Sequence, residues 1–487
     1  MKQGKIRKNS FSAAHEAKPS GEKIPQPDNL PWQSRIGRYE IPLVFILAFL
    51  IFNTVSLVTI TSSDVAPATF LPAAIILNHN FYFDFATSLT SDPVFQYAFL
   101  FENGHYVSLF PVVTPVLVTP VYFLSYAICN IFSLPITPED FIILGKTSAT
   151  ILSAIATVIF YCAAKELFPK KTAVLTTFVF AIATPTWSIS SQALWQTGMV
   201  ELLLVSLVYL IIRNQRAPHM SNVVLMGVLS GLFFFNRPPD SLLLIPVIVY
   251  IFLHQKAKIP HFITGIVAGG LPFLLYNLFI FGNFLGGYKE NLGRFIIGPG
   301  FIWNYAGLLI APNVGILVFA PVLILSVIGF LWLKDMNNPD ARQVLLIFGP
   351  VIALHILLYS FFDSWYSASG FCFGPRYLTG LIPVLCMYVG IFFTRVFSHK
   401  RNSYRDRGIQ AAIAVLIVIS VIIQVIGVLY YPYNPDKTMD IDRAWSLTNS
   451  LIVESYVTGS QTMEKITIYT LPPLPPLFNY RFEHARG

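Results

Sequence analysis

Long apolar runs separated by short polar connectors occupy the chain from residue 41 to residue 430. Helices of soluble proteins carry a polar face, and most of these runs do not. About 20 apolar residues are enough to cross a bilayer as one helix. The pattern therefore predicts an all-α polytopic membrane protein with about eleven transmembrane helices, within a range of about 11 to 13. The predicted spans are 41–60, 144–164, 172–185, 199–212, 222–236, 241–254, 261–281, 314–333, 343–362, 377–398 and 408–430.

Composition agrees with this pattern. Of the 487 residues, 55% are hydrophobic and only 11% are charged, whereas a soluble chain carries about 25% charged residues. The net charge of +8 does not indicate nucleic-acid binding, because the basic residues lie in the connectors and form no stripe with interleaved aromatics.

The basic connectors predict the orientation of the chain in the membrane. Cytoplasmic connectors carry an excess of Lys and Arg. The connectors expected in the cytoplasm are 165–171, 213–219, 254–261, 334–342 and 395–407, together with residues 1–40, a basic tail that we expect to be disordered. The segments expected outside are 61–143, 186–198, 237–240, 282–313, 363–376 and the tail 431–487, which is too short for a sizeable independent domain.

One apolar stretch, 111–134, is ambiguous. It contains Pro111, Pro115 and Pro120, each of which lacks the backbone N–H that a helix interior uses. We interpret it as a re-entrant or interfacial helix of the first outer loop, 61–143, within a membrane domain at 41–430. If it crosses the membrane, the count becomes twelve and one later assignment is wrong.

Acidic and basic residues with candidate chemistry gather at outer span ends and in outer loops. Asp64 follows the first span by a few residues, so a helix end fixes its height, and its carboxylate is a candidate general base. An ordinary solvated acid at a span end fits the same spacing. Asp84 lies among aromatics in the same loop, followed by His105, and either belongs to a substrate site or anchors an interfacial helix.

Several outer residues carry groups suited to an anionic sugar donor. Arg376, which precedes Tyr377, can bind a phosphate bidentately or extend to a lipid headgroup. Arg237 either faces an anionic substrate or pairs with Asp240, and Lys289 and Arg294 are weaker candidates for that role. Trp195 and Gln196 suit sugar faces and hydroxyls, although tryptophan also belongs to interfacial aromatic belts. The chain lacks GxxxxGK[ST], HExxH and C-x-x-C motifs, which argues against nucleotide hydrolysis.

A set of short motifs in a fixed order resembles membrane glycosyltransferases of the GT-C fold. The motifs are Ser63-Asp64, Phe70-Leu71-Pro72, Asn103-Gly104-His105-Tyr106, Phe110-Pro111, Leu194-Trp195-Gln196, Asn236-Arg237-Pro238, Tyr276-Asn277, Phe281-Gly282-Asn283, Gly307-Leu308-Leu309 and Phe373-Gly374-Pro375-Arg376-Tyr377-Leu378. The chain is similar, over roughly residues 40–400, to bacterial and archaeal relatives of dolichyl-phosphate-mannose protein mannosyltransferases and aminoarabinose lipid A transferases.

The resemblance implies an inverting transferase of the plasma membrane and cell envelope that takes a sugar from a polyprenyl-phosphate donor on the outer leaflet. Asp64 matches the catalytic base, and Arg376 and Arg237 match basic residues that stabilise the leaving phosphate. Relatives often carry Arg at the start of the span after the proline-rich helix, where this chain has Lys146, so Lys146 is a further candidate for binding the donor. Val65 replaces the second residue of an acidic pair found in the protein mannosyltransferases, which puts a protein acceptor in doubt. The acceptor is a glycan, a lipid or a protein.

Two other functions remain compatible with the sequence. A flippase or transporter of lipid-linked saccharides would share the substrate and the many spans, but it would need a polar path through the bilayer, and the spans hold few charges. A polymerase or ligase of lipid-linked oligosaccharides would use a diphosphate-linked donor. We expect no cofactor: a monophosphate leaving group does not require a divalent metal, and the sequence shows no ligand cluster.

Overall fold

The computed structural model describes residues 37, 39–55, 62–336, 338–368, 372–398, 404–431, 439–462, 465–475 and 478–481. These residues form a mostly helical structure with two small sheets, which confirms an all-α polytopic membrane protein. The tail predicted to be disordered, residues 1–40, lies outside the described residues except for positions 37, 39 and 40.

Each predicted span coincides with a helix. These helices are α2 (Glu40–Phe52), α6 (Pro138–Leu167), α7 (Lys170–Ile182), α8 (Gln196–Arg216), α9 (Met220–Asn236), α10 (Ile245–His254), α11 (Ile259–Phe281), α15 (Leu325–Leu331), α16 (Pro339–Ser360), α17 (Ile382–Ser398) and α18 (Tyr404–Leu429). The other helices are α3 (Ala66–Ala73), α4 (Thr87–Thr90), α5 (Val113–Ile131), α12 (Lys289–Leu292), α13 (Phe301–Ile310), α14 (Ile316–Phe319), α19 (Ile441–Trp445) and α20 (Leu451–Thr462). The strands are β1 (Thr54–Val55), β2 (Phe99–Glu102), β3 (His105–Ser108), β4 (Lys465–Ile468) and β5 (Phe478–Arg481).

Within the described residues, seven helical segments are long and apolar enough to cross a membrane alone. They are Val113–Ile131, Pro138–Leu167, Gln196–Arg216, Lys256–Phe281, Ala341–Ser360, Arg376–Ser398 and Asp406–Leu429. Several other predicted spans are shorter than expected. The prediction of one helix over 41–60 is wrong at its end: α2 stops at Phe52, because Thr54 and Val55 leave the helix to pair with β4.

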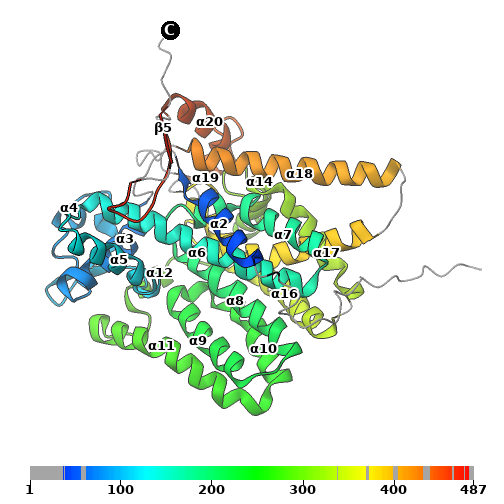
Figure 1. The fold of residues 1–487 in the computed structure, drawn as a ribbon, viewed down its shortest axis with the longest axis horizontal. Helices are drawn as coiled ribbons and strands as arrows, with labels where there is room; N and C mark the ends of the chain where they lie inside the picture. Colours follow the sequence, from blue (N-terminus) through cyan, green and yellow to red (C-terminus); the bar gives the residue numbers. More distant parts are fainter. Residues whose placement is uncertain are drawn as a thin grey trace, which may run out of the picture.

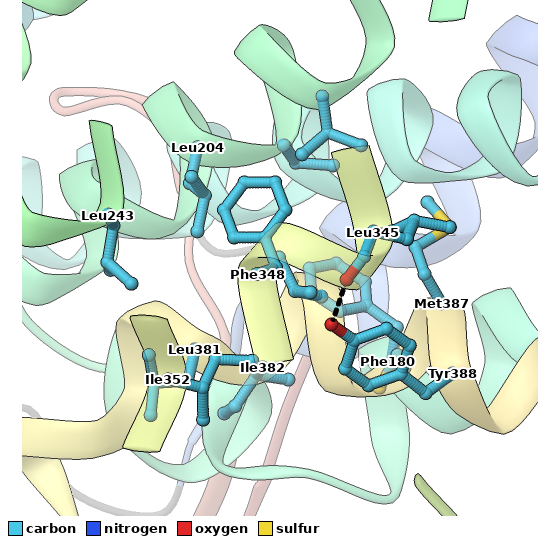
Figure 2. Packing of buried hydrophobic residues seen from close by; sticks show 14 of the residues in the cluster. Phe180, Leu204, Leu243, Leu345, Phe348, Ile352, Leu381, Ile382, Met387 and Tyr388 are labelled. Atoms are coloured by element: carbon cyan, nitrogen blue, oxygen red, sulfur yellow. Dashed lines mark hydrogen bonds between the residues drawn. The ribbon is translucent and has the colours of Figure 1, made fainter. Parts of the chain in front are cut away.

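The membrane domain is held together by a large apolar core. Leu204 of α8, Phe348 of α16 and Met387 of α17 are fully buried in it, as the close view of Figure 2 shows. The hydroxyl of Tyr388 in α17 donates a hydrogen bond to the backbone oxygen of Leu345 in α16, 2.7 Å away. A buried polar group of this kind needs a hydrogen-bond partner, because loss of the partner leaves the group unpaired in an apolar interior.

Helices α9 and α11 lie close together because glycines face each other along their contact. A Cβ added to Gly227 would lie 2.2 Å from the backbone oxygen of Phe262, and one added to Gly265 would lie 2.2 Å from that of Val224. Small residues allow this close backbone approach between membrane helices. The other side of α11 is apolar and exposed, at the edge of the molecule in Figure 1.

Connectors predicted to be cytoplasmic meet at one face of the helix array. Glu40 at the start of α2 pairs with Lys165, 3.0 Å away, and with Lys170; Arg216 pairs with Glu166, and Arg395 with Asp335. The opposite ends of α2, α6 and α8 carry the loops that contain Asp64 and Trp195. We call this second face the site face. Its outward orientation stays a prediction.

Helices α3, α4 and α5 gather at one end of the molecule, as Figure 1 shows. Thr114, at the start of α5, donates a hydrogen bond to the Asn236 side chain at the site-face end of α9, 2.7 Å away. Ser125, three turns later, bonds to the backbone of Pro472 in the segment that follows β4. Both parts of α5 therefore contact segments near the site face, while α5 is also long and apolar enough to cross a membrane, so the interfacial position of 111–134 stays a prediction.

Candidate functional site

A cavity of about 370 Å³, with charged and aromatic side chains in its lining, opens at the site face. It is lined by Asp64, Tyr97, Leu109, Phe110, Trp195, Gln196, Arg237, Tyr288, Asn291, Arg294, Phe295, Tyr359, Phe362, Ser364, Tyr366, Ser367, Arg376, Tyr377 and Met439. The lining comes from segments far apart in the chain, from the first loop to the residues after α18. The cavity contains seven of the candidates that the sequence singled out: Asp64, Trp195, Gln196, Arg237, Arg294, Arg376 and Tyr377.

Asp64 is held at the cavity by contacts on both carboxylate oxygens. It lies in a 3₁₀ turn, Ser63–Val65 (η1), whose Val65 is buried against Ile189 and Trp195. Its Oδ2 lies 2.6 Å from Nη1 of Arg376, and its Oδ1 accepts a hydrogen bond from the Tyr97 hydroxyl. The carboxylate keeps 21% of its surface exposed, so it is both oriented and accessible.

Arg376 begins the turn Arg376–Leu381 (η11), which continues into α17. Gly374, two residues earlier, has a φ of 111°, and a Cβ there would lie 2.8 Å from the Phe319 ring. Glycine is therefore required for the turn that delivers Arg376. The guanidinium lies over the Trp195 ring, 4.5 Å from its centroid, and is almost entirely buried. Trp195 thus acts here as a platform for an arginine.

Arg237 enters the cavity from the connector between α9 and α10. Its Nε donates to the Tyr359 hydroxyl, 3.0 Å away, and lies 3.2 Å from Oδ2 of Asp240. The Tyr359 hydroxyl in turn donates to Oδ1 of Asp240, 2.6 Å away. The structural pairing with Asp240 that the sequence suggested is present, and Arg237 also lines the cavity.

Arg294 completes a set of three arginines in the cavity lining. Its Nε donates to Asp363, 3.1 Å away, and its Nη2 donates to Ser364, 2.6 Å away. This pair is far more exposed than the other two, with 42% of Arg294 and 39% of Asp363 accessible. Arg294 therefore lies at the rim, where solvent weakens an ion pair.

Hydroxyl and amide groups line the rest of the cavity. The Tyr377 hydroxyl is 2.9 Å from that of Ser367, and Gln196 and Asn291 contribute amides. Burial raises the pKa of the Tyr288 phenol, although the nearby Arg237 opposes this, so Tyr288 remains a proton donor. Such groups suit the hydroxyls of a sugar, while the guanidiniums suit a phosphate.

The structure does not bring Lys146 to this cavity. Its ammonium donates to the backbone oxygens of Phe52 (2.5 Å) and Ser191 (2.7 Å) and to the Thr150 hydroxyl (3.2 Å), and it is 5% exposed. All three partners are neutral oxygens: Phe52 ends α2, Ser191 lies in the connector before α8, and Thr150 lies one turn further along α6 itself. Lys146 therefore joins these elements beneath the site and does not face the cavity.

Asp84 and His105 also lie outside the cavity lining. Asp84 accepts hydrogen bonds from the backbone of Tyr106, 2.9 Å away, and contacts Nδ1 of His105 at 2.6 Å, while the Tyr82 ring stacks on His105. Partial burial raises the pKa of Asp84, but the bonds from Tyr106 and His105 outweigh it and leave that pKa below its usual range. This arrangement ties the loop to the β2–β3 hairpin and not to a helix, and a role of Asp84 or His105 in binding substrate stays a prediction.

Several cavity residues were not singled out from the sequence. Tyr97, Tyr288, Tyr359 and Ser367 are examples, and Met439 lies in the tail after the last predicted span. Tyr97 and Tyr288 lie in loops predicted to be on the same side as Asp64, so a search of those loops for hydroxyls would have included them. Tyr359 lies near the end of an apolar helix, where no sequence signal separates it from an interfacial tyrosine.

Among the described residues, no group of three or more His, Cys, Asp or Glu side chains could hold a metal ion. The expectation that the protein uses no cofactor stays a prediction. Cys372 is near the site, but burial raises the pKa of its thiol to about 12, so it is not an activated nucleophile.

Comparison with known proteins gives one family. No curated protein matches the chain. Residues 141–277, from the first turns of α6 to the last turns of α11, match the model of the family described as dolichyl-phosphate-mannose-protein mannosyltransferase. The matched stretch includes Trp195, Gln196 and Arg237. The chain is thus similar to membrane glycosyltransferases of the mannosyltransferase type, with a GT-C-like helical architecture.

Proposed function

We propose that this protein transfers a sugar from a polyprenyl-phosphate donor to an acceptor hydroxyl, at the extracytoplasmic face of the plasma membrane. The observation that carries the proposal is the placement of the Asp64 carboxylate in one cavity with the guanidiniums of Arg237, Arg294 and Arg376. A base for the acceptor and positive charge for a leaving phosphate are the two groups that this reaction needs. The mannosyltransferase-type similarity supports the same reaction class.

In the proposed reaction, the acceptor oxygen attacks the anomeric carbon from the side opposite the phosphate. A new carbon–oxygen bond forms as the bond from the anomeric carbon to the phosphate oxygen breaks, so the configuration inverts. The acceptor proton passes to the Asp64 carboxylate and then to solvent. The polyprenyl phosphate leaves with the bonding electron pair, and the arginines of the cavity stabilise its charge.

The first prediction tests Asp64. Replacement Asp64→Asn keeps the shape of the side chain but removes its capacity to accept the proton, so we expect transfer to fall by about 10²–10⁴-fold. The measurement is the formation of glycoside and free polyprenyl phosphate, using purified protein in nanodiscs, a polyprenyl phosphate bearing a radiolabelled hexose or pentose, and cell-envelope fractions as the acceptor source.

Asp442→Asn is the matched control, because Asp442 is an exposed carboxylate outside the cavity lining. We expect it to leave transfer unchanged. Full activity of well-expressed Asp64→Asn protein would exclude Asp64 as the base. Movement of the lipid-linked sugar across vesicles without a new glycosidic bond would replace the transferase with a flippase, and a strict requirement for a diphosphate-linked donor would indicate a polymerase or ligase.

A further inference from the structure

The three arginines of the cavity differ in which of their N–H groups remain available to a ligand. In Arg376, Nη1 donates to Asp64 and Nη2 to the Tyr377 hydroxyl, 3.3 Å away. In Arg237, Nε makes the protein contacts, with Tyr359 and Asp240. Both terminal nitrogens of Arg237 lack a hydrogen-bond partner among the described residues. Neither nitrogen is fully shielded from solvent.

The contacts behind Arg237 fix the direction of its side chain. Tyr359 and Asp240 are buried, with Asp240 fully inaccessible. The Tyr359 ring is held in turn by stacking on Tyr377, with 5.1 Å between centroids and planes 13° apart. His355 completes the surroundings of Asp240, with its Nε2 3.9 Å from Oδ1. A guanidinium anchored through Nε presents its two terminal nitrogens as a fork, which is the geometry that binds two phosphate oxygens.

We infer that Arg237 binds the phosphate of the lipid donor, that Asp240 and Tyr359 are the positioning residues that aim it, and that Arg376 instead orients Asp64. This inference rests on the proposed function, because it assigns parts of the same site. It assigns different roles to Arg237 and Arg376, which the sequence alone does not distinguish. It also gives a role to Asp240 and Tyr359, which contact Arg237 and need not contact the substrate themselves.

The test measures binding of the phosphate group without requiring transfer. The probes are a polyprenyl monophosphate and the corresponding polyprenol, and the readout is the ratio of their affinities for protein in nanodiscs. Arg237→Lys keeps the charge but loses the fork, so we expect the ratio to fall by about tenfold or more. We expect Tyr359→Phe and Asp240→Asn to lower the ratio by about three- to tenfold, because Arg237 stays present but is less well aimed.

Arg376→Lys should leave the affinity ratio within about twofold of the wild type while lowering kcat, since Arg376 acts on Asp64. Tyr388→Phe is the matched control for Tyr359→Phe: it also removes a buried tyrosine hydroxyl, in this case one that bonds α17 to the Leu345 backbone of α16 (Figure 2), and Tyr388 is not part of the cavity lining. A general loss of packing would affect both tyrosine variants, whereas the inferred role affects only Tyr359.

The outcomes separate the inference from the proposed function. If wild-type protein prefers the phosphate and Arg237→Lys retains that preference, the assignment of Arg237 is wrong. Loss of the preference in Arg376→Lys, with Arg237→Lys unaffected, would exchange the two roles and also overturn the inference. If wild-type protein shows no preference for the phosphate over the polyprenol, the proposed donor class fails together with the inference.

Discussion

Each arginine of the cavity is paired with a different carboxylate, and the pairs differ in their exposure to solvent. The side chains are 9% and 0% exposed in Arg237–Asp240, 6% and 21% in Arg376–Asp64, and 42% and 39% in Arg294–Asp363. Breaking a buried pair leaves an uncompensated charge, whereas an exposed pair contributes little. The same residue types therefore differ in how much they contribute to stability at three places in one cavity. We expect substitution of the rim pair, Arg294–Asp363, to be tolerated best.

Asp84 offers a test of a structural carboxylate in the same loop as Asp64. Asp84→Asn removes the charge that accepts bonds from Tyr106 and His105, so we expect a loss of less than about 1 kcal/mol of stability, because both side chains of the ion pair are over two-fifths exposed. Transfer by the folded variant should stay within about twofold of the wild type, in contrast to the loss expected for Asp64→Asn.

The pH dependence of this contribution has a defined sign. The pKa of Asp84 is lower in the folded protein than its usual value, so the contribution is complete above about pH 4 and is lost as the pH falls through the folded value. Thermal unfolding of wild-type and Asp84→Asn protein in detergent, followed from pH 7 to pH 3, should show curves that converge at the acidic end. A difference that widens at low pH would contradict this account.

The location of a single residue could be predicted from the sequence where a neighbouring helix end determines it. Asp64 could be placed at the site face because it follows a helix, and Arg376 because it precedes one. The partners of Lys146 could not be predicted, since the oxygens that it bonds are 94 residues away at Phe52 and 45 residues away at Ser191. The pairing of Tyr359 with Arg237 spans 122 residues, and no helical or strand period relates them.

At the scale of elements, the contact of α9 with α11 sets the position of Asn236 and Arg237. Gly227→Ala or Gly265→Ala would place a methyl group 2.2 Å from a backbone oxygen, so the helices must move apart. Overpacking of this kind costs about 1–3 kcal/mol. We expect each variant to unfold at a lower temperature in detergent and to lose donor affinity.

Gly408→Ala is the control for this pair of variants. Gly408 also lies in a helix, α18, but a Cβ there would meet nothing within 4 Å. We expect its unfolding temperature to be unchanged or slightly higher, because alanine favours helix over glycine. Equal destabilisation by all three substitutions would show that the close approach of α9 and α11 is not the cause.

Apolar runs predicted these helices well, because a membrane helix is long and makes its backbone hydrogen bonds within its own segment of the sequence. Each predicted span contains a helix, but the interruptions were not visible. The run 41–60 ends its helix at Phe52 because β1 pairs with β4, more than 400 residues later. Likewise, the run 314–333 is divided among α14, α15 and the 3₁₀ turn Pro321–Ile324 between them. Such breaks depend on tertiary contacts that hydropathy does not record.

At the scale of the whole molecule, segments near both ends of the chain contribute to one site. Asp64 lies shortly after β1, which pairs with β4 of the C-terminal segment, and Met439 from that segment's beginning lines the cavity. In Figure 1, α19 and α20 lie beside α18, near the described end of the chain. The described part of the tail 431–487, which we expected to be too short for an independent domain, therefore contributes to the cavity lining.

Asn313 holds this C-terminal segment to the membrane domain. Its amide nitrogen donates to the backbone oxygens of Arg443 (2.7 Å), Ser446 (3.0 Å) and Asn449 (3.1 Å), and its amide oxygen accepts from the backbone of Leu451 (2.5 Å). The side chain is fully buried. One side chain thus contacts four backbone groups in α19, in the connection to α20 and at the start of α20, so its loss should release this segment more than it destabilises the membrane helices.

We therefore expect Asn313→Ala to raise the rate of trypsin cleavage at Arg443 by about tenfold or more, since each lost buried hydrogen bond costs about 1 kcal/mol. Because Met439 lines the cavity, the KM for the lipid-linked donor should rise, while the unfolding temperature of the membrane domain changes little. Asn304→Ala, which removes a single bond to the Ser360 backbone at 2.9 Å, is the matched control and should leave cleavage at Arg443 unchanged. Faster cleavage with an unaltered KM would show that the segment covers the site without shaping it.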